Sequence, residues 1–161
     1  MVKMVRIVEW LNGWMIKRSG SLIMSEAEKE MDAVFDDNIN YLKLNDISAY
    51  KTAFELSNYV WNLDNAWDYF PKDTVGKQFV KAIDSISANI AEGFGRYGKK
   101  DKIKFYRYSL GSLKEALDWN EKSKARHLIN QKHYDHIFKT LNALPKQIYN
   151  LINYTNQKLK Y

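Results

Sequence analysis

Two glutamates are the first candidates for chemistry, because acid–base catalysis or a metal site in a helical protein needs carboxylates that converge. Glu92 and Glu115 occupy polar positions in successive amphipathic segments. A di-metal helical bundle pairs glutamates with Glu-x-x-His motifs, and neither glutamate has a histidine three residues further on. Salt bridges to Arg96 or Arg107 account for both acids without a metal. We therefore predict no catalytic carboxylate pair.

Histidines and nucleophiles give no stronger signal. His133 and His136 share a helical face and His127 precedes them, but a third zinc ligand at a suitable spacing is absent. The chain has no cysteine, which excludes a thiol nucleophile, and it has no Gly-x-Ser-x-Gly elbow. We expect surface histidines, no metal, no cofactor and no enzymatic activity.

The most informative polar segment runs from residue 96 to residue 107 and carries six basic residues against one acid. Basic side chains neutralise phosphates, and tyrosines stack on unpaired bases. The segment thus predicts a nucleic-acid site formed by Arg96, Lys99, Lys100, Lys102, Lys104 and Arg107, interleaved with Tyr97, Tyr106 and Tyr108. The alternative is a solvated basic turn whose aromatic side chains pack inward, and the pattern leaves both open.

Charge is unevenly distributed along the 161 residues, whose formal net charge is +6. Residues 1–95 carry 10 basic and 14 acidic side chains, whereas residues 96–161 carry 15 and 5. This asymmetry suits a polyanionic partner, and it equally allows the acidic face of one subunit to meet the basic face of another.

Apolar spacing predicts the elements that position these residues. Four amphipathic helices follow residue 46, each with apolar residues every three or four positions. The first should end before Phe70-Pro71, and Asp73 or Thr74 should cap the second. The inward positions of these two helices are Ala49, Ala53, Leu56, Val60, Leu63 and Trp67, then Val75, Phe79, Ala82, Ile83, Ile86, Ile90 and Phe94.

The third helix should begin between Gly98 and Asp101 and run to about Arg126, and Asn130 should cap the fourth. Pro145 falls inside the fourth pattern and should kink that helix without ending it. The inward positions are Phe105, Ser109, Leu113, Ala116 and Asn120, then Tyr134, Ile137, Phe138, Leu141, Leu144, Ile148, Leu151, Ile152, Thr155 and Leu159.

The predicted class is all-α, an antiparallel up-down-up-down four-helix bundle over residues 46–161. Residues 1–45 are expected to form an N-terminal extension, loosely packed or partly helical. Within it, residues 1–23 look like an upstream segment that need not belong to the expressed protein. Charged residues interrupt the apolar stretch 1–16, so we expect no membrane span and a cytoplasmic protein.

Two motifs carry a resemblance to a known family. Ser85-Ile-Ser-Ala-Asn-Ile-Ala-Glu-Gly-Phe-Gly-Arg96 is followed by Phe105 and by Gly111-Ser-Leu-Lys-Glu115, and Phe70-Pro71 precedes the second helix. Over roughly residues 47–157 the chain resembles the 23S rRNA-intervening sequence proteins, which include accessory proteins of diversity-generating retroelements. The segment between Pro71 and Ser85 looks shorter than in many members, and residues 1–40 have no counterpart.

The resemblance implies a four-helix bundle that assembles into a homo-oligomeric ring, typically a pentamer, with a basic surface. No catalytic activity is established for the family. Where a role is known, in the retroelement accessory proteins, the bundle binds a reverse transcriptase and nucleic acid.

The motif residues also allow a structural role. Asn89, Glu92 and Gly93 on the second helix, with Gly111, Ser112 and Glu115 on the third, are expected at helix–helix or subunit interfaces. Glycine inside a helix costs about 1 kcal/mol relative to alanine, so Gly111 should mark a close approach of a neighbouring helix. A ligand or nucleic-acid role for these residues is the alternative.

Two functional hypotheses follow. The leading one is a non-enzymatic homo-oligomer that binds nucleic acid, RNA in preference to DNA, through the basic segment 96–107. The other is an oligomeric scaffold for a protein client such as a reverse transcriptase or another nucleic-acid enzyme. Its expected hot spots are exposed aromatic residues outside the bundle stripe, Trp14, Tyr59 and Trp119.

Overall fold

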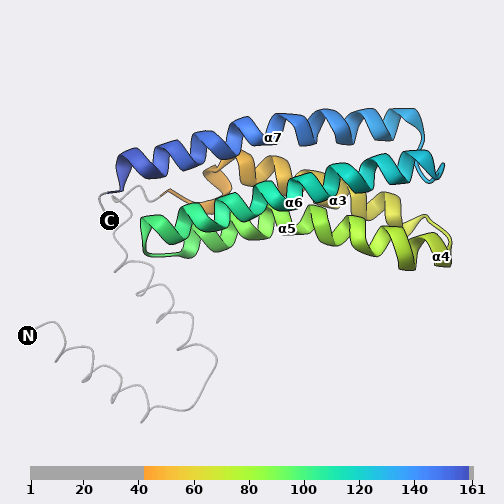
Figure 1. Cartoon of the computed structure of the whole chain (residues 1–161), viewed down its shortest axis with the longest axis horizontal. Coiled ribbons are helices and arrows are strands. Elements are labelled where there is room, and N and C mark those ends of the chain that lie inside the picture. Colours follow the sequence, from red (N-terminus) through yellow and green to blue (C-terminus); the bar gives the residue numbers. More distant parts are fainter. Residues whose placement is uncertain (1–41, 160–161) are drawn as a thin grey trace, which may run out of the picture. The chain divides into compact units, whose positions relative to one another are not determined.

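All regular structure in the part of the chain that the computed structural model describes, residues 42–159, is helical. Four long helices lie side by side: α3 (Ser48–Asn65), α5 (Lys77–Gly95), α6 (Lys99–Ala125) and α7 (Gln131–Lys158) (Figure 1). Three short pieces accompany them: the 3-10 turn η1 (Leu44–Asp46), α4 (Tyr69–Pro71) and the π-helical turn η2 (Lys72–Gly76). The predicted all-helical class and four-helix bundle are confirmed.

Residues 1–41 lie outside the described range. The predictions made for them, including the upstream segment 1–23 and the exposed side chain of Trp14, therefore stay predictions. The expected start of the bundle at residue 46 falls at the end of η1.

α3 follows its predicted apolar stripe. Ala49, Ala53, Leu56 and Val60 are buried at spacings of four and three residues, which places them on one helical face. Leu63 packs partly buried against the same core. The helix ends at Asn65, before the Phe-Pro pair as predicted.

The start of the next helical segment differs from the prediction. Helical structure begins at Tyr69, directly after Asp68, and not at a cap formed by Asp73 or Thr74. Pro71 lies within the first turn, where a missing N–H costs nothing because the first N–H groups of a helix have no partner within it. The Thr74 hydroxyl donates to the Phe70 carbonyl at 2.7 Å, so it supports the turn from inside.

α6 has its predicted bounds, but one inward position is wrong. Tyr106 is only 2% exposed, whereas the neighbouring Phe105 is half-buried. The reason lies on α5, where Gly93 has no side chain and leaves room for the Tyr106 ring. Burial raises the pKa of the Tyr106 hydroxyl, while its hydrogen bond with Thr155 of α7 acts in the opposite direction.

α7 confirms its predicted cap and its length. The Asn130 side chain accepts a hydrogen bond from the His133 backbone N–H at 3.0 Å, and the helix continues through Pro145 to Lys158. Its core positions are the predicted Ile137, Leu141, Leu144, Ile148, Ile152 and Thr155. Phe138 and Leu159, also predicted to face inward, are exposed.

Contacts at the helix ends show which segments adjoin. The Asn120 amide near the end of α6 donates to the Tyr134 carbonyl near the start of α7, at 3.4 Å. At the other end of the pair, Lys99 Nζ lies 3.4 Å from the Asn156 carbonyl. Along the α3–α5 pair the Ser57 hydroxyl donates to Asp84. Within residues 42–159, no helix combines the length and apolar character that a membrane crossing requires.

Candidate nucleic-acid interface

The six basic residues predicted to bind nucleic acid lie around the turn from α5 to α6, but they do not form one uniform surface. Lys102 points back into the bundle. Its Nζ donates to the Phe94 carbonyl at 2.6 Å and lies 5.6 Å from the centre of the Phe94 ring. Burial lowers the pKa of this lysine. Lys102 therefore supplies a hydrogen-bond donor to a carbonyl near the end of α5, and its contacts lie within the bundle.

Arg96 and Lys99 are partly engaged. Arg96 forms an ion pair with Glu92 one turn earlier in the sequence, and its guanidinium lies 4.6 Å from the centre of the Phe105 ring. Both partners of the ion pair are about half exposed, so the pair contributes on the order of 1 kcal/mol or less. Lys99 is half-buried against α7 through its contact with Asn156.

The remaining three cations are exposed and lie in one row. Lys100, Lys104 and Arg107 follow one another at spacings of four and three residues, so they share a face of α6. None of them forms an ion pair within residues 42–159. Lys104 Nζ lies 5.8 Å from the centre of the Tyr108 ring.

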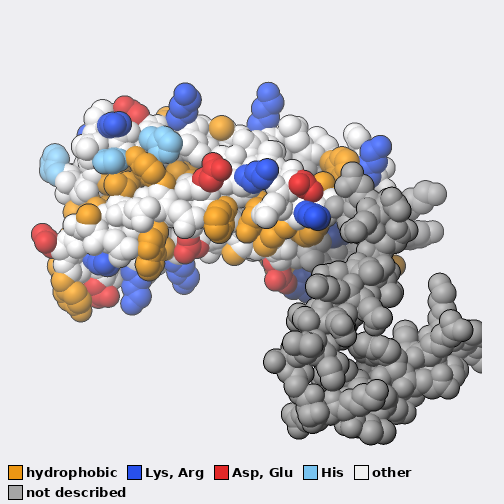
Figure 2. Space-filling model, turned by 180° about the vertical axis from the view of Figure 1, so that it is seen from behind, with side chains coloured by type: hydrophobic (Ala, Val, Ile, Leu, Met, Phe, Trp, Pro, Cys, Tyr) orange, Lys and Arg blue, Asp and Glu red, His pale blue; other side chains and the backbone are white. Residues whose placement is uncertain are grey.

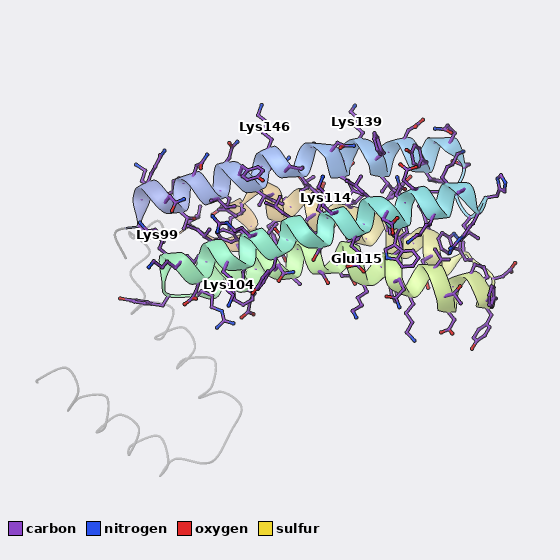
Figure 3. All side chains as sticks on the ribbon, viewed as in Figure 1. Lys99, Lys104, Lys114, Glu115, Lys139 and Lys146 are labelled. Carbon is purple, nitrogen blue, oxygen red and sulfur yellow. The ribbon has the colours of Figure 1, made fainter. Side chains whose placement is uncertain are left out.

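Helical spacing adds a fourth cation that the prediction missed. Lys114 is exposed and follows Arg107 by seven residues on α6 (Figure 3). We call Lys100, Lys104, Arg107 and Lys114 the α6 stripe. Extending the period of 3.6 residues beyond residue 107 would have found Lys114 from the sequence.

Gly111 lies on the face of α6 that carries the α6 stripe. The prediction that a neighbouring helix approaches Gly111 closely is wrong within the described residues. A methyl group added at Gly111 would meet no atom within 4 Å, so no helix within the described residues approaches there. The close approach is at Gly93, where an added methyl carbon would lie 2.6 Å from the Tyr106 ring. The helix–helix role expected for the motif thus belongs to Gly93.

Of the other motif residues, Asn89 connects α5 to α6, whereas Glu115 is exposed. The Asn89 amide donates to the Ser85 carbonyl at 2.7 Å and reaches the Ser112 hydroxyl of α6 at 3.5 Å. Glu115 is exposed and has no ion pair within residues 42–159, so the salt bridge expected for it is wrong. Over that same range, no three His, Asp or Glu side chains cluster in a way that could hold a metal ion.

The aromatic residues near the basic segment divide by exposure. Tyr106 is buried, so the prediction that it stacks on bases is wrong. Tyr97 is 97% exposed and Tyr108 is about half exposed. Two of the three predicted stacking side chains therefore remain accessible.

The expected protein-binding hot spots are also corrected. Tyr59 is half-buried: its hydroxyl lies 2.6 Å from His133 Nδ1, and its ring centre lies 4.4 Å from that of His136. Trp119 is half-buried, with Lys122 Nζ 4.4 Å from its ring centre. Both side chains lie at the edges of the apolar helix faces, where residue spacing alone does not distinguish half-buried from exposed positions.

Comparisons with known proteins identify the fold and the family of this chain. A solved structure from Bacteroides thetaiotaomicron VPI-5482, described as a protein of unknown function from the S23 ribosomal protein family, is similar with a TM-score of 0.59 and 22% sequence identity. The match covers 65% of this chain and 97% of that one, and at this identity it shows the fold alone. No curated protein matches the sequence significantly. The family model for the 23S rRNA-intervening sequence protein matches residues 45–150, and the chain therefore belongs to that family.

Proposed function

We propose that this protein is a non-enzymatic homo-oligomer that binds nucleic acid, RNA in preference to DNA, through the α6 stripe. The observation that carries the proposal is the exposed row of Lys100, Lys104 and Arg107, which is free of ion pairs within residues 42–159. Arg96 and Lys99 flank the row, and Lys102 supports the turn beside it.

The proposed architecture is the antiparallel up-down-up-down order of α3, α5, α6 and α7. Contacts at opposite ends of the α6–α7 pair support this order, because Asn120 meets Tyr134 and Lys99 meets Asn156. The connections are also short, as in antiparallel bundles. In this arrangement the basic turn before α6 lies at one end of the bundle, beside the C-terminal end of α7.

The dimensions of the α6 stripe suit a single strand. From Lys100 to Lys114 the helix rises about 21 Å, at about 1.5 Å per residue. One nucleic-acid strand places about six phosphates along that length, at about 3.4 Å each. Tyr97 in the turn before α6 and Tyr108 next to Lys104 on α6 are accessible, and they supply faces on which unpaired bases stack. RNA presents unpaired bases in loops, bulges and ends, so the proposed target is a single-stranded stretch of RNA.

Oligomerisation would bring several copies of the α6 stripe together on one particle. Family membership supports a ring, with a pentamer as the favoured state, and several stripes on one particle raise the affinity for a long strand through effective concentration. Light scattering tests this step. A particle mass near five times 19.0 kDa supports the ring, and a monomer contradicts it.

The binding experiment is a fluorescence-anisotropy titration of a labelled 20-nucleotide single-stranded RNA at 50 mM salt. Charge reversal of Lys100, Lys104 and Arg107 to Glu should raise Kd more than about tenfold, because three phosphate contacts become repulsive. The matched control reverses Lys132, Lys139 and Lys146, which are exposed on α7, and this variant changes the net charge equally. Figure 3 shows Lys139 and Lys146 pointing away from the bundle.

The control variant should retain RNA affinity within about threefold of the unmodified protein. Equal losses in both variants would mean that net charge alone drives binding, which contradicts the stripe. A DNA strand of the same sequence tests the preference, and DNA should bind more weakly than RNA.

A second candidate function is a scaffold for a protein client. Its supporting observation is Phe70, which is 74% exposed at the start of α4, beside the still more exposed Tyr69. Large exposed aromatic side chains are typical anchors of protein interfaces. Recovery of one protein from nuclease-treated lysate, lost in Phe70→Ala, supports this function, and recovery that is unchanged in Phe70→Ala contradicts it.

A further inference from the structure

Two large aromatic side chains are exposed on α7, the helix next to the α6 stripe. Phe138 is 41% exposed and Tyr149 is 55% exposed. They are eleven residues apart, which is about three helical turns, so both lie on the same face of α7. Neither belongs to the buried core of the bundle, and this face of α7 therefore presents two rings to solvent.

Contacts with α6 show which way this face of α7 points. The Tyr134 hydroxyl donates to Glu121 of α6 at 2.6 Å, and the Phe138 ring stacks on the Tyr134 ring with 5.6 Å between their centres. Asn156, seven residues after Tyr149, also contacts α6. Phe138 and Tyr149 therefore lie at the edge of α7 that adjoins α6.

Part of the α6 stripe lies at the matching edge of α6. Arg107, Lys114 and Glu121 follow one another at intervals of seven residues, so the two cations share the face through which Glu121 meets α7. In the proposed antiparallel pair, Arg107 is about level with Tyr149, and Lys114 is within about one turn of Phe138. Each exposed ring thus has a cation at about its own height along the bundle.

The facing parts of α6 and α7 contain no acid. α6 has no Asp or Glu from residue 102 to residue 114, and α7 has none from residue 136 to residue 158. Figure 3 shows Lys114 on the side of α6 toward α7 and Glu115 on the side toward α5. The phosphates of a strand therefore meet no carboxylate between the two rings.

The side of the bundle that carries α3 differs. α3 lies behind α5 and α6 in Figure 1 and so faces the viewer in Figure 2, where acidic and basic side chains are mixed. Exposed acids on α3 and α5 include Glu55 and Asp84. Because carboxylates repel phosphates, a strand is favoured at the edge between α6 and α7 over that side.

We propose that Phe138 and Tyr149 of α7 stack on unpaired bases of the strand whose phosphates contact Arg107 and Lys114 of α6. This inference rests on the proposed nucleic-acid binding and extends its site from one helix to two. The rings are about 17 Å apart along α7, at about 1.5 Å per residue. A stacked strand covers that length in about five nucleotides, at about 3.4 Å each. Bases of a duplex are already paired and stacked on one another, so the surface selects single strands over duplexes.

The test is fluorescence anisotropy of the full chain with a labelled 20-nucleotide single-stranded RNA and with an RNA duplex of the same length. Phe138→Leu and Tyr149→Leu should each raise Kd for the single strand about tenfold, because each removes the stacking of one base. Kd for the duplex should change by less than about twofold. The slope of log Kd against log salt concentration should stay unchanged, since no phosphate contact is removed. An unchanged single-strand affinity overturns the proposal, and so do equal losses for both RNAs.

Two further variants serve as controls. Tyr149→Phe keeps the ring and should bind the single strand within about twofold of the unmodified protein. Tyr154→Leu removes an exposed aromatic side chain from a different face of α7 and should leave binding unchanged. Circular dichroism and light scattering verify that each variant keeps its fold and its particle mass. A reduced particle mass in Phe138→Leu or Tyr149→Leu would assign the rings to a contact between subunits and overturn the proposal.

The same titrations separate this proposal from the α6 stripe. If reversal of Lys100, Lys104 and Arg107 to Glu weakens binding and the two leucine variants do not, the stripe stands and the proposal for the rings fails. If the unmodified protein does not bind single-stranded RNA at 50 mM salt, the proposed function itself fails. If the leucine variants lose affinity and the α6 variant binds normally, the stripe fails, and with it the phosphate contacts assigned here.

Discussion

Gly93 of α5 lies so close to Tyr106 of α6 that a methyl carbon on the glycine would approach the tyrosine ring to 2.6 Å and the Lys102 carbonyl to 2.9 Å. The second neighbour is backbone and cannot move aside by rotating. The absence of a side chain at Gly93 therefore sets the distance between these two helices and allows Tyr106 to be buried.

Gly93→Ala should lower the free energy of unfolding by about 1–3 kcal/mol, the usual cost of overpacking a core. Gly95→Ala is the matched control, because a methyl group there meets no atom within 4 Å. The control should be neutral or stabilising by up to about 1 kcal/mol, since alanine favours helix over glycine. Urea unfolding measures both, and equal stabilities for the two variants would contradict the packing described.

Lys102 should act on stability and not on RNA binding. Lys102→Met removes the hydrogen bond to the Phe94 carbonyl and should cost about 1–2 kcal/mol of unfolding free energy. Lys100→Met removes an exposed cation and should change stability by less than about 0.5 kcal/mol. RNA affinity should fall in Lys100→Met and remain unchanged in folded Lys102→Met. The opposite result would show that Lys102 belongs to the binding surface.

Asp64→Asn should raise stability at neutral pH. Burial raises the pKa of Asp64 above its ordinary value of 3.8, so the folded state holds the proton more tightly than the unfolded state. The stability that this group contributes is therefore present below pH 3.8 and is lost as the pH rises through the folded-state pKa.

Asparagine does not titrate, so Asp64→Asn does not lose stability in this way as the pH rises. It should be more stable than the unmodified protein at pH 7, by about 1 kcal/mol, the usual scale of one buried polar group. The advantage should disappear near pH 3.5. Urea midpoints at several pH values measure it, with the exposed Asp73→Asn as control, and an advantage that does not change with pH would refute the assignment.

His127 carries backbone strain in the turn between α6 and α7. Its φ is 57°, in the left-handed region, and the Leu128 N–H bonds to the Ser123 carbonyl at 2.9 Å to close the end of α6. Glycine adopts this conformation freely. His127→Gly should raise the thermal midpoint and stabilise the fold by about 1 kcal/mol, whereas His127→Val should destabilise it; a less stable glycine variant would contradict the geometry.

Helical periodicity predicted most of the fold because the bundle is built from long regular stripes. α6 and α7 begin and end where expected. The Asn130 cap is confirmed, because capping depends only on a local contact, here between the Asn130 side-chain oxygen and the backbone N–H of His133. The start of the second helical segment was misplaced, because a proline can follow the end of one helix or fit the first turn of the next, and local sequence does not separate these cases.

The site was harder to predict because its geometry depends on other helices. Tyr106 and Phe105 are neighbours in sequence, and only the missing side chain of Gly93 on α5 determines which one is buried. Likewise, Lys102 resembles its basic neighbours in sequence, and only the position of the Phe94 carbonyl separates it from them. The burial of Asp64 gave no sequence signal, since one aspartate in a helix is normally exposed.

The most direct test of the central claim is the salt dependence of RNA binding. Plots of log Kd against log salt concentration, from 50 to 300 mM, count the phosphates that the protein neutralises. Reversal of Lys100, Lys104 and Arg107 to Glu should reduce the slope by about 2, since each single-strand contact contributes about 0.7. The Lys132, Lys139 and Lys146 variant should retain the original slope. Equal slopes for the unmodified protein and the α6 variant would contradict the account.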